Sequence, residues 1–364
     1  MSSILIHHVI ILIVLVALAV VPPCFARKRH VVDFRAPNLF PESHVWDQSE
    51  QHFVVGSWSQ RSIYTVSDAG VVETLIVDTD LADGVIIAGL AIDSVNRRLI
   101  AVIHSKDPLP SFDALAAYDL KTRKRLFLVP LLDSNASSRP LANDVAVDFN
   151  GNAYVTNAAG NFIWKITIDG ESSVLSKSPT FTSQKVDEGK PWSFCGLNGI
   201  AYVNKGYLLV VQSNTGKMFK VDVDDGKTRR VLLPVDLVAA DGIAIRNDGV
   251  VVVVSHHKAW LLKSQDSWAE GGVYDEIPLD VSKFASSVTI REDNKAYVLY
   301  GHIDEAVKGN VQRETFRIEE IESKKDNEEE NIWMFVLIGL GLAYVLYWRF
   351  QMGQLVKNMN KKTN

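Results

Sequence analysis

The sequence predicts an all-β protein, and the spacing of its repeats predicts a six-bladed β-propeller. Between residues 30 and 321 there is no long helical period. Short alternating runs of Val, Ile, Leu and Tyr are separated by Asp-Gly, Asn-Gly and Lys-Gly turns, the pattern of successive β-hairpins. Six self-similar segments are centred on positions 46, 91, 146, 201, 244 and 289, with spacings of 45, 55, 55, 43 and 45 residues. Units of this size suit propeller blades, each a small antiparallel sheet around a central channel. One sandwich or two smaller β domains are the alternatives, because strand patterns do not define topology.

The same succession of strands recurs within the units. In the third unit, a turn at residues 149–152 leads into a return strand at 153–156 and a third strand at 162–166. An insertion at 167–197 accounts for one long repeat, and we expect either a lid over the channel mouth or an ordinary surface loop there.

The first 26 residues predict a secretory signal peptide. Residues 9–21 are an unbroken apolar run, followed by a Pro-Pro pair and by the small residue Ala26. The segment before the run contains His7 and His8 but no Lys or Arg, so an uncleaved signal anchor is the alternative. The propeller is then expected to occupy residues 27–321.

The C-terminal region predicts a single membrane span at residues 332–348. This stretch is apolar throughout with aromatic residues towards both ends, and its 17 residues extend about 25 Å as a helix. An acidic linker, 322–331, precedes it, and a basic tail, 349–364, follows it. Since basic flanks stay in the cytoplasm, we expect a type I protein with a luminal propeller.

Two further signals concern the secretory pathway. Lys361 and Lys362 stand fourth and third from the carboxyl end and resemble a dilysine retrieval signal, which predicts recognition by coat machinery and residence in the endoplasmic reticulum membrane. Another secretory-pathway membrane is the alternative location. Asn135, in the sequence Asn-Ala-Ser, is a predicted glycosylation site.

Charge and cysteine content exclude other classes. The chain has a formal net charge of −5, and removing the tail's four positive charges leaves −9, which argues against a nucleic-acid partner. Of the two cysteines, Cys24 lies in the predicted signal peptide, so Cys195 has no partner for an internal disulfide in a cleaved protein.

Oxygen-bearing side chains recur just before the predicted innermost strand of each unit. The six residues at this position are Glu42, Ala88, Asn143, Asn198, Asp241 and Ser286. In a propeller these positions meet at one mouth of the channel. Two carboxylates and two amides are hard oxygen donors suited to Ca²⁺ rather than zinc, so we expect Glu42, Asn143, Asn198 and Asp241 to bind calcium. The alternative is that they are turn residues that bond to the local backbone.

The segments around these four residues, at 41–47, 141–148, 197–201 and 240–244, resemble the ligand motifs of the gluconolactonase family (senescence marker protein, or regucalcin). Diisopropylfluorophosphatase and the paraoxonases belong to the same calcium-dependent phosphotriesterase superfamily. The resemblance covers about 31–321 and implies a six-bladed propeller with a catalytic Ca²⁺ and hydrolysis of lactones, esters or phosphotriesters. Family members often have Glu-Gly-Pro where this chain has Glu42-Ser43-His44, a departure that affects substrate fit more than metal binding.

Hairpin geometry adds catalytic candidates, because each second strand returns to the same mouth. The residues that end these return strands are Ser57, His104, Asn157, Gln212 or Ser213, His256 and His302. Histidine is suited to general base chemistry near neutral pH. The strand ending at His104 resembles the paraoxonase strand that carries the catalytic His, and the segment ending at His256 resembles another pocket strand of that family. We therefore predict Asp241, His104 and His256 as catalytic residues.

Several aromatic residues are candidates for lining a hydrophobic pocket, although we expect most of them in blade packing. They are Trp58, Trp164, Phe181, Trp192 and Trp260.

The sequence thus predicts a Ca²⁺-dependent hydrolase acting on a small ester or lactone and anchored in the membrane by its C-terminal helix. The main alternative is a membrane-anchored, non-catalytic propeller with structural Ca²⁺ that binds a protein partner. A condensing enzyme resembling strictosidine synthase ranks last, because Glu292 is the one Glu between residues 280 and 302 and it lies in a predicted turn.

Overall fold

The computed structural model describes residues 29–105, 112–132, 141–309 and 312–362. The predicted signal peptide and Asn135 lie outside these ranges. The chain has two compact units, one formed by His30–Glu322 and a second that includes Ser323–Asn364.

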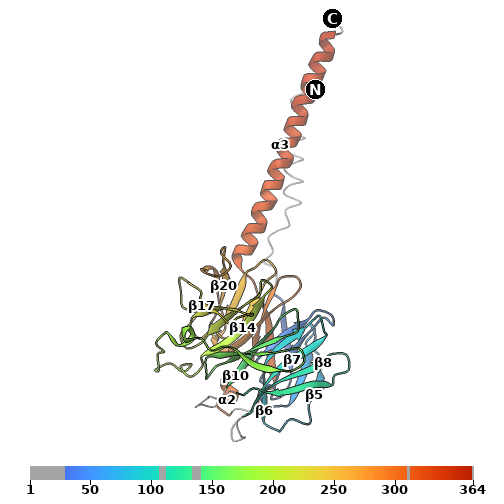
Figure 1. Ribbon diagram of the computed structural model, residues 1–364. Coiled ribbons are helices and arrows are strands. Elements are labelled where there is room, and N and C mark those ends of the chain that lie inside the picture. Colours follow the sequence, from blue (N-terminus) through green and yellow to red (C-terminus); the bar gives the residue numbers. More distant parts are fainter. Residues whose placement is uncertain (1–28, 106–111, 133–140, 310–311, 363–364) are drawn as a thin grey trace. The chain divides into compact units, whose positions relative to one another are not determined.

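The first unit contains the six predicted blades, each a four-stranded antiparallel sheet (Figure 1). The first three sheets are β2 (His44–Asp47), β3 (His52–Val55), β4 (Ser62–Val66) and β5 (Val72–Val77); β6 (Val85–Asp93), β7 (Arg98–Ser105), β8 (Asp113–Asp119) and β9 (Arg125–Pro130); and β10 (Ala142–Val147), β11 (Ala153–Asn157), β12 (Phe162–Ile166) and β13 (Ser172–Ser176). The next two are β14 (Leu197–Val203), β15 (Tyr207–Gln212), β16 (Met218–Asp222) and β17 (Thr228–Arg230); and β18 (Ile243–Ile245), β19 (Val251–Val254), β20 (Lys258–Lys263) and β21 (Gly272–Pro278). The sixth contains β22 (Ala285–Ile290), β23 (Ala296–Tyr300) and β24 (Thr315–Ile321), with β1 (Val31–Arg35) as its outer strand. The six-bladed propeller is therefore confirmed.

Among the described residues of the propeller, three short helices lie between strands. They are the 3₁₀ helices η1 (Pro179–Thr182) and η2 (Val281–Lys283) and the α-helix α2 (Ile303–Val307).

The ring is closed by strands from the two ends of the propeller sequence. β1 pairs antiparallel with β24, from Val31 opposite Glu319 to Arg35 opposite Thr315. The innermost strands of consecutive sheets contact one another, and β22 contacts β2. The repeats alone did not predict the β1 pairing, because β1 is a single strand with no hairpin partner beside it in sequence.

Large apolar side chains fill the space between neighbouring sheets. Of the predicted aromatic residues, Trp164, Phe181 and Trp260 are buried in these cores. Burial of apolar surface contributes about 25 cal/mol per Å², so the interfaces between sheets hold the ring together.

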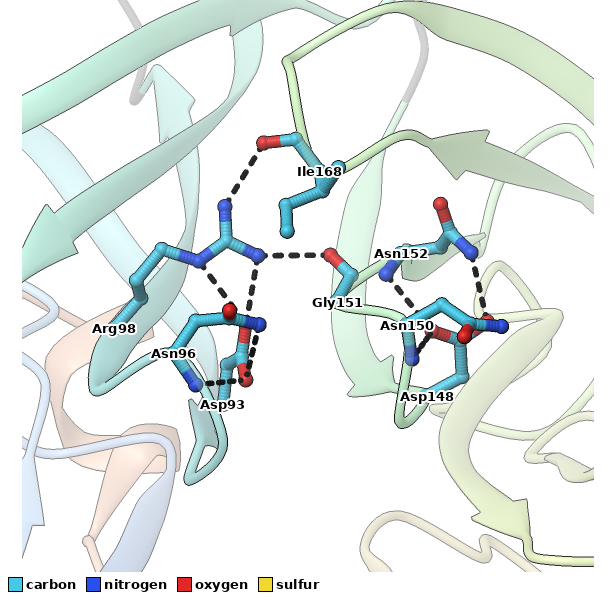
Figure 2. Close-up of polar contacts among 8 residues, drawn as sticks. All are labelled: Asp93, Asn96, Arg98, Asp148, Asn150, Gly151, Asn152 and Ile168. Carbon is cyan, nitrogen blue, oxygen red and sulfur yellow. Dashed lines mark hydrogen bonds and ion pairs between the residues drawn. The ribbon is translucent and has the colours of Figure 1, made fainter.

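A polar cluster joins the turns of the second and third sheets (Figure 2). Arg98 and Asp93 are both buried, and Arg98 donates to Asp93 Oδ2 from Nε (3.0 Å) and Nη2 (2.7 Å). The same guanidinium donates across the blade boundary to the carbonyl oxygens of Gly151 (Nη2, 2.9 Å) and Ile168 (Nη1, 2.9 Å). Gly151 has φ +81°, and a Cβ there would lie 2.7 Å from Arg98 Nη2, so the turn requires glycine.

We expect Arg98→Met to destabilise the propeller by about 3–5 kcal/mol, because Asp93 would stay buried without its cationic partner. Arg35→Met is the matched control, since the Arg35 pair with Glu314 is exposed and such pairs contribute about 0–1 kcal/mol. Urea unfolding of both variants measures the difference. Equal stability of the two variants would show that the Arg98 cluster does not hold the two blades together.

The second unit contains the helix α3 (Lys324–Lys362), 39 residues long. Most of the predicted acidic linker and of the predicted tail belongs to this helix. The stretch long and apolar enough to cross a membrane is Val336–Met359, 24 residues, or about 36 Å of helix. It overlaps the predicted span at 332–348 and continues beyond that span to Met359. Its apolar side chains, including Leu337, Tyr344 and Trp348, are exposed, as expected for a helix that spans a bilayer.

Candidate functional site

The predicted ligand positions lie at irregularities of the innermost strands. In four of the six sheets the innermost strand begins earlier than the sequence predicts. Its pairing with the second strand shifts register at the predicted ligand position. The residues within these shifts include Ala88, Asn143, Asn198 and Ser286. The expectation that they precede the strand was therefore wrong, whereas Glu42 and Asp241 do precede β2 and β18. A β-bulge redirects a side chain while the flanking residues keep their pairing.

Glycines allow neighbouring innermost strands to approach one another closely. A Cβ on Gly89 would lie 2.6 Å from Asp144 Cα, and one on Gly199 would lie 2.2 Å from the Asp241 carbonyl oxygen. The space left between the strands is about 20 Å³, enough for one ion or water molecule. Its lining residues are Glu42, Ser43, Gly89, Asn143, Asp144, Asn198, Asp241, Gly242, Ser286 and Ser287.

Three carboxyl groups interact electrostatically at this site. Desolvation, and then the negative charges of Asp241 and Asp144, raise the pKa of Glu42 well above its usual value. Desolvation and the charge of Asp144 raise the pKa of Asp241 to about 8, against a hydrogen bond from Asn198. Desolvation raises the pKa of Asp144 to about 7, against backbone hydrogen bonds from Val145 and Ile200. Among the described residues, no Lys, Arg or His side chain forms an ion pair with any of the three.

These residues fit a calcium ion. Glu42 Oε2 is buried with no hydrogen-bond partner, so a cation at this position would satisfy it. Asn198 donates from Nδ2 to Ser213 Oγ (3.0 Å), which leaves its amide oxygen as a ligand. Within the described ranges no cluster of three or more His, Cys, Asp or Glu side chains is placed to hold a metal. The predicted donor set, which lines the small site, is a mixture of carboxylate and amide oxygens. Such a set suits Ca²⁺ rather than zinc.

A larger cavity of about 430 Å³ lies against this small site. All six predicted metal-binding and catalytic residues line it: Glu42, His104, Asn143, Asn198, Asp241 and His256. Of the other return-strand candidates, Ser213 also lines the cavity, and Ser57, Asn157, Gln212 and His302 are absent from its described lining. Trp58 and Trp192 are the two predicted aromatic residues that line it.

His104 is held by a residue that the sequence analysis did not identify. Asp113 lies directly opposite His104 on the neighbouring strand, and its Oδ1 is hydrogen-bonded to His104 Nδ1. Asp113 Oδ2 accepts the backbone N–H of Ala142 (3.1 Å), next to Asn143. Because Nδ1 is engaged, Nε2 is the ring nitrogen available for proton transfer. Aligning the two strands β7 and β8 across the loop that joins them would have paired His104 with Asp113.

His256 lies among aromatic rings. Its ring stacks on Phe284 at 5.5 Å between centroids, and the Trp192 ring lies 5.7 Å away. Desolvation lowers the pKa of His256, so the neutral ring predominates at neutral pH. Trp192 belongs to the predicted insertion at 167–197, which contributes cavity wall through Pro191, Trp192, Phe194 and Cys195.

His302 has a structural role instead. It adopts φ 53° at the N-terminus of α2, and its Nδ1 is hydrogen-bonded to Glu305 Oε1 (3.1 Å). The helix itself lines the cavity through Ile303, Asp304 and Val307. The sequence analysis missed this helix because it is only five residues long.

Comparison with solved structures confirms the expected fold. The major Malassezia sympodialis allergen Mala s 1 has a TM-score of 0.67 at 16% identity, with 81% of this chain and 96% of that chain covered. A gluconolactonase from Xanthomonas campestris has a TM-score of 0.54 at 16% identity, with coverage of 81% and 91%. The chain has the propeller fold of the gluconolactonases. Virginiamycin B lyase from Staphylococcus aureus shares this propeller architecture, with a TM-score of 0.51, 12% identity and coverage of 81% and 100%. No protein-family model matches the sequence, and no curated protein matches it.

The three carboxyl groups of this gluconolactonase-type propeller predict how calcium affects stability. Their folded pKa values lie above the unfolded values of about 4, so their protonated forms stabilise the metal-free protein at low pH, and this stability is lost as pH rises through about 7–8. A bound calcium ion would relieve the repulsion between the ionised groups. We therefore expect calcium to raise the melting temperature more at about pH 8 than at about pH 6.

Thermal unfolding with calcium or chelator at the two pH values measures this difference. The Glu42→Gln/Asp241→Asn double variant is the control, and calcium should change its melting temperature little at either pH. A calcium response that is equal at both pH values in the wild type would contradict the expectation.

Proposed function

We propose that the protein is a Ca²⁺-dependent hydrolase of lactones, esters or phosphotriesters. The observation that carries this proposal is that one cavity joins a set of carboxylate and amide oxygens to the hydrogen-bonded pair His104 and Asp113. The gluconolactonase fold is consistent with it. The structural neighbours include both a gluconolactonase and a lyase, so the proposal depends on the site rather than on the fold.

Glu42, Asn143, Asn198 and Asp241 would hold the ion. When bound, Ca²⁺ supplies Lewis acidity that polarises a carbonyl or phosphoryl oxygen and stabilises the negative charge that develops on it. Asp144, whose side chain is fixed by the backbone N–H groups of Val145 (2.8 Å) and Ile200 (3.2 Å), adds negative charge next to the ligands.

The proton transfers are assigned to His104. Its Nε2 accepts a proton from water as the water oxygen attacks the substrate carbon or phosphorus, and the proton then passes to the leaving oxygen as the ester bond breaks. Asp113 orients the ring, as the carboxylate does in other His-carboxylate pairs. Asp241 is the second candidate base. His256 is neutral at working pH and contributes to the aromatic wall above the site.

The membrane location is a separate proposal. We propose that α3 anchors the protein as a type I membrane protein of the endoplasmic reticulum, with the propeller in the lumen and Lys361 and Lys362 available to coat machinery. The apolar stretch of α3 and the basic residues that follow the predicted span support it.

Lys361→Ser/Lys362→Ser should move the tagged protein to later secretory compartments, and glycosidase-sensitive mobility should depend on Asn135. An unchanged location with unglycosylated Asn135 would contradict it.

The hydrolase proposal predicts chelator-sensitive turnover. We expect Asp241→Asn to abolish hydrolysis of the best substrate in a panel of lactones, aryl esters and phosphotriesters, because it removes both a metal ligand and a candidate base. Asp224→Asn, in an exposed hairpin, is the matched control and should retain activity. Calcium-dependent melting without turnover on any substrate would instead favour the non-catalytic, protein-binding alternative.

The role of Asp113 is tested by kinetics. Asp113→Asn should lower kcat by about 10²–10⁴ with little change in KM, because the ring of His104 loses its orientation while the cavity is preserved. Asp119→Asn, at the other end of β8, is the control. A variant that raises KM alone would show that Asp113 shapes the cavity instead of positioning the base.

A further inference from the structure

Apolar side chains dominate the walls of the candidate active-site cavity. Carboxylates and amides gather at one end, and the side walls include Trp58, Ile86, Leu141, Trp192 and Phe284. A hydroxyl group that loses water without gaining a partner costs about 1–3 kcal/mol. Ser213, which carries the one hydroxyl side chain in the described lining, already donates to the Ala240 carbonyl oxygen (2.6 Å) and accepts from Asn198. A substrate rich in hydroxyl groups would therefore be poorly satisfied along these walls.

The charges of the cavity disfavour an anionic substrate. Three carboxyl side chains, Glu42, Asp241 and Asp304, line the cavity, and Asp144 lines the small site against it. Lys308 is the one Lys or Arg in the described lining of the cavity. Its side chain is 74% exposed and donates from Nζ to Asp304 Oδ2 (2.9 Å), so it is solvated and already paired.

The apolar wall continues to the mouth of the cavity. Phe194 is 72% exposed and Val307 is 66% exposed, yet both line the cavity. They come from separate segments, the insertion after the third sheet and α2 of the sixth. An extended apolar group bound at the carboxylate end would cover both side chains as it leaves the cavity, and this burial would stabilise the complex.

We propose that the substrates are uncharged lactones or esters with an alkyl chain, whose reactive group lies at the carboxylate end and whose chain runs along the apolar wall to Phe194 and Val307. This inference rests on the proposed hydrolase function and names its substrate class. Burial of one methylene changes the free energy enough for about a fourfold gain in affinity, so affinity should increase with chain length until the chain passes the mouth.

Binding of lactams tests the substrate class separately from turnover, because a lactam resembles a lactone but its amide bond resists hydrolysis. We would titrate N-unsubstituted γ-lactams with alkyl chains of increasing length into the full-length protein, with and without calcium, by calorimetry. The comparison ligands are a polyhydroxylated lactam and a carboxylate-bearing lactam. We expect affinity to rise about fourfold per methylene and the two comparison ligands to bind at least tenfold more weakly.

Two variants test where the alkyl chain of the ligand binds. Phe194→Ser should weaken binding of the longer lactams only. Phe149→Ser is the matched control, since Phe149 is 60% exposed in a turn outside the cavity lining, and should leave the series unchanged. Equal effects of the two variants, or tighter binding of the hydroxylated or anionic lactam, would overturn the inference. Chain-dependent binding without hydrolysis of the matching lactones would support the inference and refute the proposed function.

Discussion

The arrangement of the whole site depends on three carboxyl groups that share one narrow, desolvated space at the channel axis. Glu42, Asp144 and Asp241 come from three different blades and are all desolvated, and repulsion between the carboxylates adds to the desolvation of Glu42 and Asp241. Without a cation, desolvation raises the pKa of all three groups, to about 7 for Asp144 and about 8 for Asp241, and repulsion adds to the shifts of Glu42 and Asp241. A bound Ca²⁺ would relieve the same repulsion at neutral pH without protonation. The carboxylate oxygens would then remain available for catalysis.

The fold maintains this costly arrangement by fixing the backbone around it. Pairing of β1 with β24 closes the ring, and glycines at 89 and 199 let adjacent innermost strands approach at distances that any side chain would prevent. Register shifts then direct Asn143 and Asn198 towards the axis without breaking the strands. The return strand β7, paired with the innermost strand β6, places His104 in the wall of the adjoining cavity, so metal-binding and proton-transfer groups have one common scaffold.

Much of this site could be predicted from sequence because a propeller brings equivalent positions of its repeats to one place. That symmetry identified Glu42, Asn143, Asn198 and Asp241, and the return strands identified His104 and His256. Asp113 and Asp144 were missed, because the importance of each depends on a pairing or a bulge that strand patterns do not reveal. His302 was wrongly grouped with the cavity residues, since its left-handed conformation begins a helix that the repeat does not contain. The pairing of β1 joins segments almost 290 residues apart, beyond any local pattern.

The central claim is that the channel site binds calcium through the four oxygen donors. Calorimetric titration of the metal-free, full-length protein with Ca²⁺, in buffers of different ionisation enthalpy, tests it directly. The account predicts one ion per chain, release of protons on binding at neutral pH, and loss of binding in the Glu42→Gln/Asp241→Asn variant. Absence of binding in the wild type, or unchanged binding in the double variant, would contradict it.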